Sequence, residues 1–370
     1  MYEAIFRPIE LGGLTLKNRI IFAPTSMGLR GEAYERRLRG IAAGGCAMIV
    51  IGDVPAGRGG PFSLYSKKGA AHYKRLCELV HAEGCLICAQ LHQSDSDFKA
   101  MLRYLPGILS GRISKEQLRP LLNRQAEKLV TGMPAEQAGA IAASFGRAAQ
   151  LAQQAGFDMI QVHGDRMCGS FSSALFNHRT DAYGGSAAGR ARFAAEAVAA
   201  VRRAAPGMPI DYKLAVRQEA PHYGNAGVLL EELPVFVPLL ERAGATSFHV
   251  TLADHADLSD PIPAADHPYF GGEGCFLRYC DLVRSCTELP ICGVGGLTSP
   301  DFVEGQLASG RIDCAAMSRQ LIADPAWPEK VRRGEAGTIR RCVRCNIACL
   351  GGMQRHEGVH CIYDRKEALK

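Results

Sequence analysis

Several features of common protein classes are missing from this 370-residue sequence. No apolar run approaches the roughly 18 residues that a membrane-spanning helix needs, so we expect no membrane insertion. The first residues, MYEAIFRPIELGG, include acidic side chains and no long apolar core, which argues against a secretory signal and predicts a cytoplasmic protein. Basic segments interleaved with aromatic residues, which are typical of nucleic-acid binding, are also missing.

Cysteine is not scarce, but the sequence gives little reason to expect disulfides. There are 14 cysteines. Disulfide frameworks are typical of small secreted domains, whereas a chain of this length without an export signal is expected to keep its thiols reduced. Cys85 and Cys88 form a C-x2-C pair within an apolar run. Three residues apart in a strand, they point to opposite faces, and we interpret them as core thiols.

A G-x-G-x-x-G turn after the first apolar run is absent too, which argues against a dinucleotide-binding open sheet. Instead, short continuous apolar runs recur, separated by turns and by Ala- and Leu-rich stretches such as residues 134–156. Such runs are typical of strands buried on both faces of a parallel sheet. We predict a (β/α)8 TIM barrel, with a doubly wound open sheet as the alternative. The eight runs span residues 18–24, 46–53, 85–91, 157–164, 210–216, 246–252, 290–296 and 313–319.

The ends of the predicted strands supply the candidate site residues, because a barrel of this kind carries its active site at the C-terminal ends of its strands. A long segment around residues 92–133 follows the third strand, and we expect it to form a lid or a wall of the substrate site. The strand-end candidates are Pro24, Thr25, Gly52, Asp53, Gln90, His92, His163, Lys213, His255, Gly295, Gly296, Ser318 and Arg319.

Two of these strand ends, GVGGL and SRQLIADP, suit a phosphate group. Gly295 and Gly296 allow backbone N–H groups to approach an anion, and Arg319 can add a bidentate contact. Gln90 can pair with the edge of a heterocycle through its donor and its acceptor. Lys213 can lie near the electron-rich end of a flavin ring, although a lysine here is as often an ion-pair partner within the barrel.

Two histidines, His163 and His255, end the fourth and sixth predicted strands. A single histidine at a barrel mouth is often only a hydrogen-bonded polar residue. Two that converge on one mouth, opposite a phosphate site, predict binding of a carbonyl substrate or proton transfer to it.

The C-terminal tail, residues 336–370, has its own cysteine pattern. Cys342, Cys345 and Cys349 form a C-x2-C-x3-C triplet, and Cys361 follows them. A triplet with one distant partner favours a [4Fe–4S] cluster. Zinc, which prefers paired C-x2-C knuckles or mixtures of cysteine and histidine, is the alternative.

The same end of the chain carries the whole net charge of +6. From Lys330 to Lys370 there are ten Lys or Arg residues against four Asp or Glu, whereas the rest of the chain has 33 of each. One interpretation is a solvated basic face. The other is a docking site for an acidic electron carrier or a reductase.

These motifs together resemble a known family. The chain is similar to the old yellow enzyme family and, within it, to the iron–sulfur branch that looks like 2,4-dienoyl-CoA reductase. The resemblance covers almost the whole chain, and R-T-D-x-Y-G-G-S together with the four-cysteine tail is its most specific part. The matching stretches are LKNRIIFAP, AQLH, AGFDMIQVHG, NHRTDAYGGS, RARF, VGGL, SRQLIADPAWPEK and RCVRCNIACL.

The resemblance implies an FMN-dependent ene-reductase with a barrel over residues 1–335 and a [4Fe–4S]-binding tail over residues 336–370. Hydride would pass from flavin N5 to the β-carbon of an α,β-unsaturated carbonyl compound, with NAD(P)H or a carrier protein as electron donor. His255 matches a catalytic histidine of the dienoyl-CoA reductase branch. By motif match, Pro24, Thr25, Ser26, Gly52, Gln90 and Lys213 line the flavin, Gly295, Gly296, Ser318 and Arg319 hold its phosphate, and Cys342, Cys345, Cys349 and Cys361 ligate the cluster.

One departure from the family pattern concerns the proton donor, which is usually a tyrosine. The block that begins at His163, HGDRMCGSFSSALFN, contains no tyrosine. We therefore expect another donor, in the order His255, His163, then Asp165 or Arg166.

The substrate and the electron donor stay open. The dienoyl-CoA reductase pattern continues into electron-supplying domains, whereas this sequence stops nine residues after Cys361, as a stand-alone form or as one piece. The alkene can be an acyl-CoA, an enone or a flavone-like phenolic. A cluster with many free thiols favours an anaerobe, and a homo-oligomer is allowed.

Two other functions are kept as alternatives. An amine dehydrogenase of the trimethylamine dehydrogenase type needs an aromatic bowl for its cation, which the single tryptophan, Trp327, cannot build. The second alternative is a non-catalytic flavin and iron–sulfur subunit that only transfers electrons.

Overall fold

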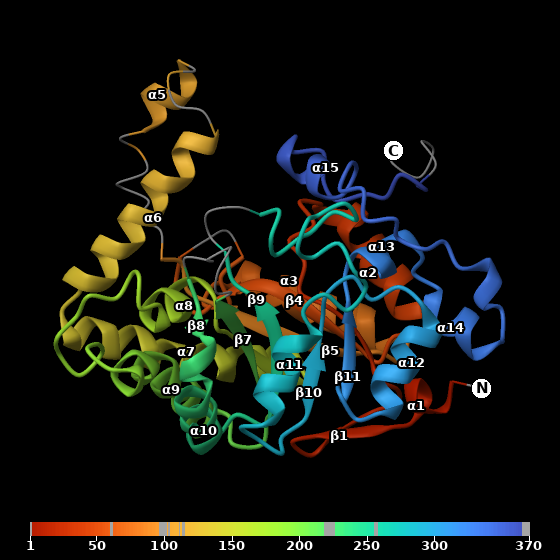
Figure 1. Cartoon of the computed structure of the whole chain (residues 1–370), viewed down its shortest axis with the longest axis horizontal. Coiled ribbons are helices and arrows are strands. Elements are labelled where there is room, and N and C mark those ends of the chain that lie inside the picture. The colour runs from red at the N-terminus through yellow and green to blue at the C-terminus, as the bar shows by residue number, and fades with distance from the viewer. Residues whose placement is uncertain are drawn as a thin grey trace.

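The structure of the chain is a computed structural model that describes residues 2–59, 62–95, 102, 104–110, 112, 115–217, 226–254 and 258–364. Within these residues, no helix is long and apolar enough to cross a membrane. Figure 1 shows a central set of strands with helices around it, and two further segments that rise above one end of the strands.

Eight parallel strands close into a barrel in the order in which they occur along the chain, and the last of them, β11, pairs with the first, β3. Each strand overlaps one of the eight predicted runs, and β4, β5 and β7 extend one or two residues beyond them, so the predicted (β/α)8 barrel is confirmed and the open sheet is excluded. A two-residue strand, β8 (Val228–Leu229), lies beside β7. The barrel strands are β3 (Ile20–Phe22), β4 (Met48–Pro55), β5 (Leu86–His92), β6 (Met159–His163), β7 (Ile210–Arg217), β9 (Ser247–Leu252), β10 (Ile291–Gly293) and β11 (Cys314–Met317).

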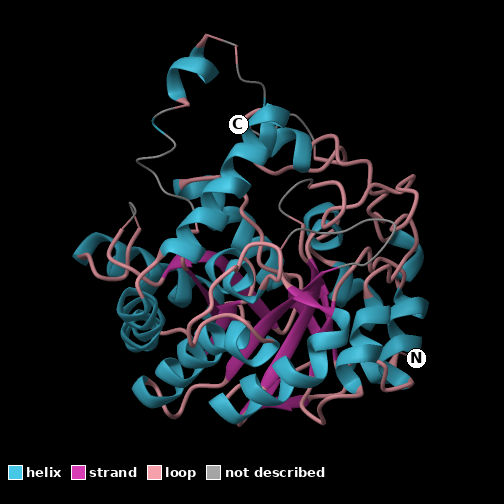
Figure 2. Cartoon of the chain, turned by 60° about the vertical axis from the view of Figure 1, so that its left-hand side comes forward, coloured by secondary structure: helices cyan, strands magenta, loops and turns pink. Residues whose placement is uncertain are grey.

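Helices surround the strands, as Figure 2 shows, and cover their outer faces. Among them, α7 and α9 approach closely because small side chains face one another. A Cβ atom at Gly146 would lie 2.6 Å from the carbonyl oxygen of Ala200, so only glycine permits this approach. The helices are α1 (Glu3–Phe6), α2 (Gly31–Ala43), α3 (Lys67–His81), α7 (Ala135–Ala155), α8 (Arg166–Ser172), α9 (Ala187–Ala204), α10 (Leu233–Ala243), α11 (Leu277–Arg284), α12 (Pro300–Ala308), α13 (Arg319–Ala323) and α14 (Trp327–Arg332), with a short 3-10 turn, η1 (Leu230–Glu232).

The N-terminal hairpin closes the lower end of the barrel. It consists of β1 (Ile9–Leu11) and β2 (Leu14–Leu16), which pair antiparallel. Leu11 and Leu16 are buried in one apolar cluster with Met48 and Cys314 from the barrel interior. Burial of these side chains seals the end of the barrel opposite to the strand ends that carry the site.

The pair Cys85 and Cys88 behaves as predicted. Both thiols are buried and free. Cys88 belongs to the apolar cluster inside the barrel, whereas Cys85 belongs to the outer core, where its Sγ lies 3.7 Å from that of Cys46. Burial raises the pKa of Cys88 well above its ordinary value. These thiols are therefore part of the core.

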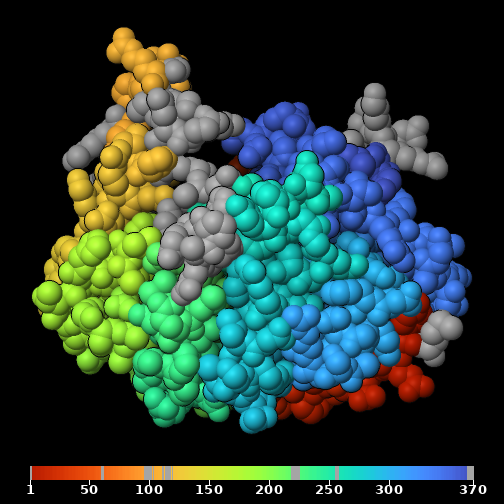
Figure 3. Space-filling model, viewed as in Figure 1, coloured from red at the N-terminus to blue at the C-terminus, as the bar shows by residue number. Residues whose placement is uncertain are grey.

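The segment after β5 forms an arm that projects beyond the C-terminal ends of the strands (Figure 3, orange and yellow). It contains α5 (Leu105–Leu109) and α6 (Lys115–Gly132). Leu118, Leu122 and Ala126 of α6 line the large cavity described below, so the arm contributes a wall to it. The arm thus lies where a lid or wall was expected.

The tail lies over the same end of the barrel (Figure 3, blue). Its regular elements are η2 (Ala336–Thr338) and α15 (Leu350–Gln354). The backbone N–H of Val359 donates to the Met27 carbonyl at 2.7 Å, and that of Cys342 donates to Gln320 Oε1 at 2.9 Å. These bonds fix the tail above the barrel.

Candidate active site

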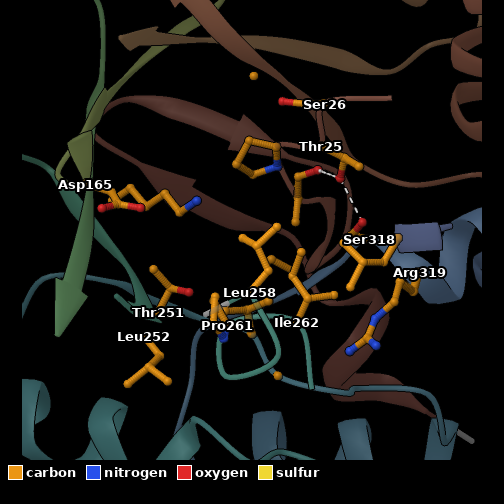
Figure 4. A pocket seen from close by; sticks show the side chains of 18 of the residues that line it. Thr25, Ser26, Asp165, Thr251, Leu252, Leu258, Pro261, Ile262, Ser318 and Arg319 are labelled. Carbon is orange, nitrogen blue, oxygen red and sulfur yellow. Dashed lines mark hydrogen bonds between the residues drawn. The ribbon is translucent and has the colours of Figure 1, made fainter. Parts of the chain in front are cut away.

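A cavity of about 650 Å³ opens at the C-terminal ends of the strands. Residues at the ends of all eight barrel strands line it, together with α6 of the arm and parts of the tail. Figure 4 shows Thr25 and Ser318 on one side of this cavity and Asp165 on the opposite side. A volume of this size lies within the range of about 300–1,000 Å³ that is usual for ligand pockets.

The structure brings nearly all predicted site residues to this one cavity. Among the strand-end candidates, His92 is not part of the cavity lining, and His255 lies outside the described residues. The predicted residues that line the cavity are Pro24, Thr25, Ser26, Gly52, Gln90, His163, Arg166, Lys213, Gly295, Gly296, Ser318 and Arg319.

A row of basic side chains crosses the cavity floor. His163, Lys213 and His249 are register partners on β6, β7 and β9, so their side chains lie side by side. The ring of His92 on β5 lies 5.7 Å from that of His163. Neighbouring strands in register thus place three imidazoles and one ammonium group in one layer.

Burial sets the charges in this row. Burial, followed by the repulsion of Lys213, holds the pKa of His163 well below its ordinary value, and its Nδ1 has no hydrogen-bond partner. The same two causes lower the pKa of His249 to about 3. Burial also lowers the pKa of Lys213, against the attraction of Asp165 and Asp53. At neutral pH, therefore, His163 and His249 are uncharged.

Asp53 brings a negative charge to the same place. Its backbone is left-handed, with φ 55°, and its carboxylate accepts a hydrogen bond from Ser26. Burial raises the pKa of Asp53, but His92, the Ser26 hydroxyl, His163 and Arg166 outweigh burial, so this pKa lies below its ordinary value.

Asp53, His92 and His163 also form the described group whose ligand atoms all lie within 4.8 Å of one another. Lys213 acts electrostatically on His163, and Arg166 acts on Asp53. These two positive charges oppose a metal cation, so we interpret the group as polar contacts for a substrate. The sequence placed each residue at a strand end but could not show that they converge.

The opposite end of the cavity fits a phosphate group. Gly295 and Gly296 have φ values of +124° and +65°, which favour glycine, and a Cβ atom at Gly295 would lie 2.9 Å from the Phe276 nitrogen. Thr25 Oγ1 donates to Ser318 Oγ at 2.7 Å (Figure 4). This arrangement leaves backbone open at the cavity beside two hydroxyl groups.

Two arginines join this end of the cavity to the tail. Arg319 Nη1 donates to the Pro263 carbonyl at 2.8 Å and to Asn346 Oδ1 at 2.7 Å. Arg344, which the sequence did not single out, donates from Nη1 to the Gly272 carbonyl at 2.8 Å and lies against Gly296. No periodicity could have found Arg344, because its place depends on how the tail lies over the barrel.

The four tail cysteines, Cys342, Cys345, Cys349 and Cys361, line one small cavity of about 20 Å³. Arg344 and Asn346 within this loop have φ values of 52° and 57°. Left-handed backbone at residues other than glycine is strained and is concentrated at functional sites. Two of the cysteines, Cys342 and Cys349, also line the large cavity, so the two sites share a wall.

The spacing of these thiols bears on the choice between a cluster and zinc. A zinc ion with bonds of about 2.3 Å would hold its sulfur ligands within about 4 Å of one another. Among the described residues, the tail thiols do not form a group whose ligand atoms all lie within 4.8 Å. The four cysteines that line this cavity would be the ligands of the cluster that their sequence spacing predicts.

With this geometry in place, comparison with known proteins identifies the family. The NADH:flavin oxidoreductase / NADH oxidase family matches residues 4–337. The chain belongs to this family. The resemblance drawn from the sequence is therefore confirmed, and the protein is a flavin-dependent oxidoreductase on a (β/α)8 barrel.

Two relatives are similar to this chain over almost its whole length. The chain is 63% identical over 369 residues to a bilirubin reductase of Clostridium symbiosum (strain WAL-14163), with 99% of both chains covered. It is 33% identical over 378 residues to a bilirubin reductase of Mediterraneibacter gnavus (strain CC55_001C), covering 99% of this chain and 57% of that one.

A solved structure shows the same fold. A 2-naphthoyl-CoA reductase in complex with 2-naphthoyl-CoA superposes with a TM-score of 0.80 at 22% identity, covering 100% of this chain and 58% of that chain. This chain thus matches the full length of the first bilirubin reductase but spans little more than half of the second and of the naphthoyl-CoA reductase.

Proposed function

We propose that this protein is an FMN-dependent ene-reductase that reduces C=C bonds of a linear tetrapyrrole of the bilirubin type. The observation that carries the proposal is the 63% identity to a bilirubin reductase over 99% of both chains. Bilirubin combines apolar rings, C=C bonds conjugated to lactam carbonyls and two propionate groups. It therefore needs an apolar wall and positive groups beside the flavin.

The cavity offers both features. Leu118 and Leu122 of the arm and Leu252 of β9 supply apolar lining. Arg166 and Lys213 supply positive charge at the same mouth. Burial lowers the pKa of Arg166, but Asp165, Asp95 and Asp53 outweigh this effect and raise it, so the guanidinium stays charged. A permanent cation here suits a propionate or a lactam carbonyl.

Bound FMN would supply the hydride for this reduction. Gln90 and Lys213, which both line the cavity, support a place for the flavin ring, and the left-handed glycines support a place for its phosphate. We assign the ring to Pro24, Thr25, Ser26, Gly52, Gln90 and Lys213, and the phosphate to Gly295, Gly296, Ser318 and Arg319.

Substrate activation is assigned to His163 and Arg166. Since His163 is uncharged at neutral pH, it acts as a hydrogen-bond donor to the substrate carbonyl rather than as a strong acid. Arg166 adds charge to the same contact. Proton delivery is left to Asp165 at the cavity edge, or to His255, which lies outside the described residues.

We propose that the tail holds a [4Fe–4S] cluster through which electrons enter, with Cys342, Cys345, Cys349 and Cys361 as its ligands. Residues 336–370 are then a functional unit distinct from the barrel over residues 1–335. Around the small cavity, Val343 and Ile362 are exposed apolar side chains, and Arg340 and Arg341 are exposed charges nearby. An apolar centre with a basic rim suits an acidic carrier protein. Direct reduction by NAD(P)H is the other route.

A rate measurement separates these two routes. Reduced ferredoxin, an acidic carrier, should reduce the protein faster than NADH, and Arg340→Glu with Arg341→Glu should slow that rate. Arg36→Glu, an exposed arginine on α2, is the matched control. Equal rates for the double variant and this control would refute docking at the tail.

The lining of the cavity does not support the amine dehydrogenase alternative. Trp327 is fully buried and its Nε1 donates to the Thr298 carbonyl at 2.9 Å, so it is part of the core. Among the described lining residues, Phe276 is the aromatic one. These residues cannot build an aromatic bowl around a cation.

Mass spectrometry tests the proposed activity. The purified holoenzyme, reduced under anaerobic conditions and given bilirubin, should yield products heavier by two hydrogens for each C=C bond reduced. Cinnamate and an enoyl-CoA, offered at the same concentration, should react more slowly. Recovery of unchanged bilirubin together with reduction of either of these would reject the tetrapyrrole as substrate.

A further inference from the structure

A second row of polar side chains lies inside the barrel, one layer below the basic row of the cavity floor. Gln90, Gln161, Asp211 and Ser247 are register partners on β5, β6, β7 and β9. Their exposed fractions are 2%, 1%, 6% and 2%, respectively. Of the four, only Gln90 lines the large cavity. A buried polar group needs a partner, so the hydrogen bonds of this row have to be accounted for.

The bonds run in one direction along the row. Ser247 Oγ donates to Asp211 Oδ1, and Gln161 Nε2 donates to Asp211 Oδ2, each at 2.6 Å. Gln161 therefore turns its carbonyl oxygen the other way, where it accepts from Gln90 Nε2 at 2.6 Å. That leaves the carbonyl oxygen of Gln90 on the cavity side, 3.4 Å from the backbone nitrogen of Asp53.

The direction is set at Asp211, because an ionised carboxylate can only accept hydrogen bonds. The reverse chain, in which Gln90 turns its NH2 group to the cavity, needs a donor at position 211. His249 is compatible with the observed direction, since its Nδ1 lies 3.4 Å from Gln161 Nε2 and accepts there when the ring carries its proton on Nε2. The Asp211 carboxylate is thus the group that holds the Gln161 amide in this orientation.

We propose that Asp211 is a positioning residue for the flavin: acting through Gln161, its carboxylate keeps the carbonyl oxygen of Gln90, not the NH2 group, facing the cofactor. This inference rests on the FMN site proposed above and adds which group of Gln90 the cofactor meets. Oxidised isoalloxazine carries one ring N–H donor, at N3, and an acceptor oxygen on the protein is its complement. Asp211 acts on the cofactor without touching it.

A double-mutant cycle on FMN affinity tests this role, read from flavin fluorescence as the cofactor dissociates from the holoenzyme. Asp211→Asn keeps the shape of the side chain, but its amide can donate as well as accept, so the row of hydrogen bonds can form in either direction. FMN should therefore bind roughly five- to tenfold more weakly, which corresponds to the loss of one hydrogen bond. In a Gln90→Ala background, Asp211→Asn should change the FMN dissociation constant no further. Cys286→Ala, which replaces a free and partly exposed cysteine outside this row, should bind FMN as the unmodified protein does.

A merely structural role would give another pattern. Asp211→Asn would then weaken FMN binding by the same factor with or without Gln90, and this result would overturn the proposal, as would unchanged affinity in the Asp211→Asn protein. If that variant fails to fold, Gln161→Leu cuts the chain in its middle and should reproduce the loss only when Gln90 is present.

A spectroscopic readout follows the same chain without substrate. FMN labelled with 15N at N3 should show a strongly hydrogen-bonded N3–H proton in the unmodified protein and an upfield shift of this proton in Asp211→Asn. An identical N3–H signal in both proteins would contradict the proposal. Because no substrate is present, failure here is distinct from failure to reduce bilirubin.

Discussion

In the barrel, strand register places Gln90, Lys213 and His163, and Gln90 and His163 are buried. The tail thiols lie instead on irregular backbone, three of them between residues 339 and 349 and the fourth, Cys361, after α15. The barrel therefore holds its site in place without the cofactor. The tail has left-handed backbone at Arg344 and Asn346, which costs free energy that a bound cluster can offset. At one end of the molecule, a barrel site that is held by packing thus lies next to a tail site whose conformation a bound cluster would stabilise.

The largest effect is expected from a substitution that removes a cysteine of the tail and leaves the barrel site intact. Cys345 lines the small cavity but not the large one. Cys345→Ala should abolish the bound iron and electron entry through the tail, while the protein keeps its FMN. Iron and flavin content per chain are the measurements. Cys286→Ala, a free and partly exposed cysteine elsewhere, is the control. Loss of FMN together with iron would show that the two sites are not independent.

The next largest effect is expected from a substitution in the barrel cavity. Arg166→Gln removes the permanent cation at the mouth and should lower kcat/KM for bilirubin roughly 10- to 100-fold, since a hydrogen bond to a charged group contributes about 1.5–3 kcal/mol. Arg166→Lys should recover part of this loss. Iron and FMN content should stay the same in both. If Arg166→Gln turns over as the unmodified protein does, the cation has no part in substrate binding.

A smaller effect concerns the buried row of the barrel. Burial, against bonds from Ser247 and Gln161 and the charge of Lys213, raises the pKa of Asp211 from 3.8 to about 6. The folded state thus holds this proton more tightly than the unfolded state. The contribution of Asp211 to stability is greatest at pH below 3.8 and is lost as the pH rises through about 6, by up to about 3 kcal/mol.

The direction of this pH dependence of stability can be checked by comparing the urea unfolding of Asp211→Asn with that of the unmodified protein. The variant should gain stability relative to the unmodified protein between pH 5 and pH 7.5, because its amide does not titrate. The same substitution should weaken FMN binding. A constant difference in the free energy of unfolding across this pH range would mean that Asp211 has an ordinary pKa.

The smallest effect compares two glycines with similar backbone. Gly296 and Gly310 have φ values of +65° and +71°, and a Cβ atom would meet Arg344 Nη1 at 2.8 Å in the first and nothing within 4 Å in the second. Both Ala substitutions should cost roughly 1–2 kcal/mol of stability from the left-handed backbone. Only Gly296→Ala should also weaken FMN binding. Equal FMN affinity in both variants would remove Gly296 from the phosphate site.

The sequence allowed much of the barrel to be predicted, because apolar runs mark buried strands and the rule for strand ends then collects residues such as Gln90, Lys213 and Ser318 in one place. The sequence could not show which residues are neighbours on adjacent strands. Nothing in the order of residues shows that Asp211 lies beside Gln161, or that Asp53 and His92 converge with His163. Register comes from hydrogen bonds between strands that lie far apart in the sequence.

For the tail, the sequence predicted a chemistry but could not predict a position. The spacing of its cysteines indicated a cluster, yet the contact of Arg344 with Gly296 depends on bonds such as that from Val359 to Met27. The bond from Val359 to Met27 joins residues more than 300 positions apart, and no local pattern encodes it. The division of the chain at residue 335, like the cluster itself, stays a prediction.

The most direct test of the proposed function is a single-turnover experiment on the flavin. Holoenzyme reduced under anaerobic conditions is mixed with bilirubin, and the return of the oxidised flavin spectrum is followed together with the loss of bilirubin absorbance. We predict that the flavin is reoxidised at the rate at which bilirubin is consumed, and that Arg166→Gln slows both rates equally. A flavin that stays reduced in the presence of bilirubin, but is reoxidised by an added electron carrier, would contradict the account and favour a subunit that only transfers electrons.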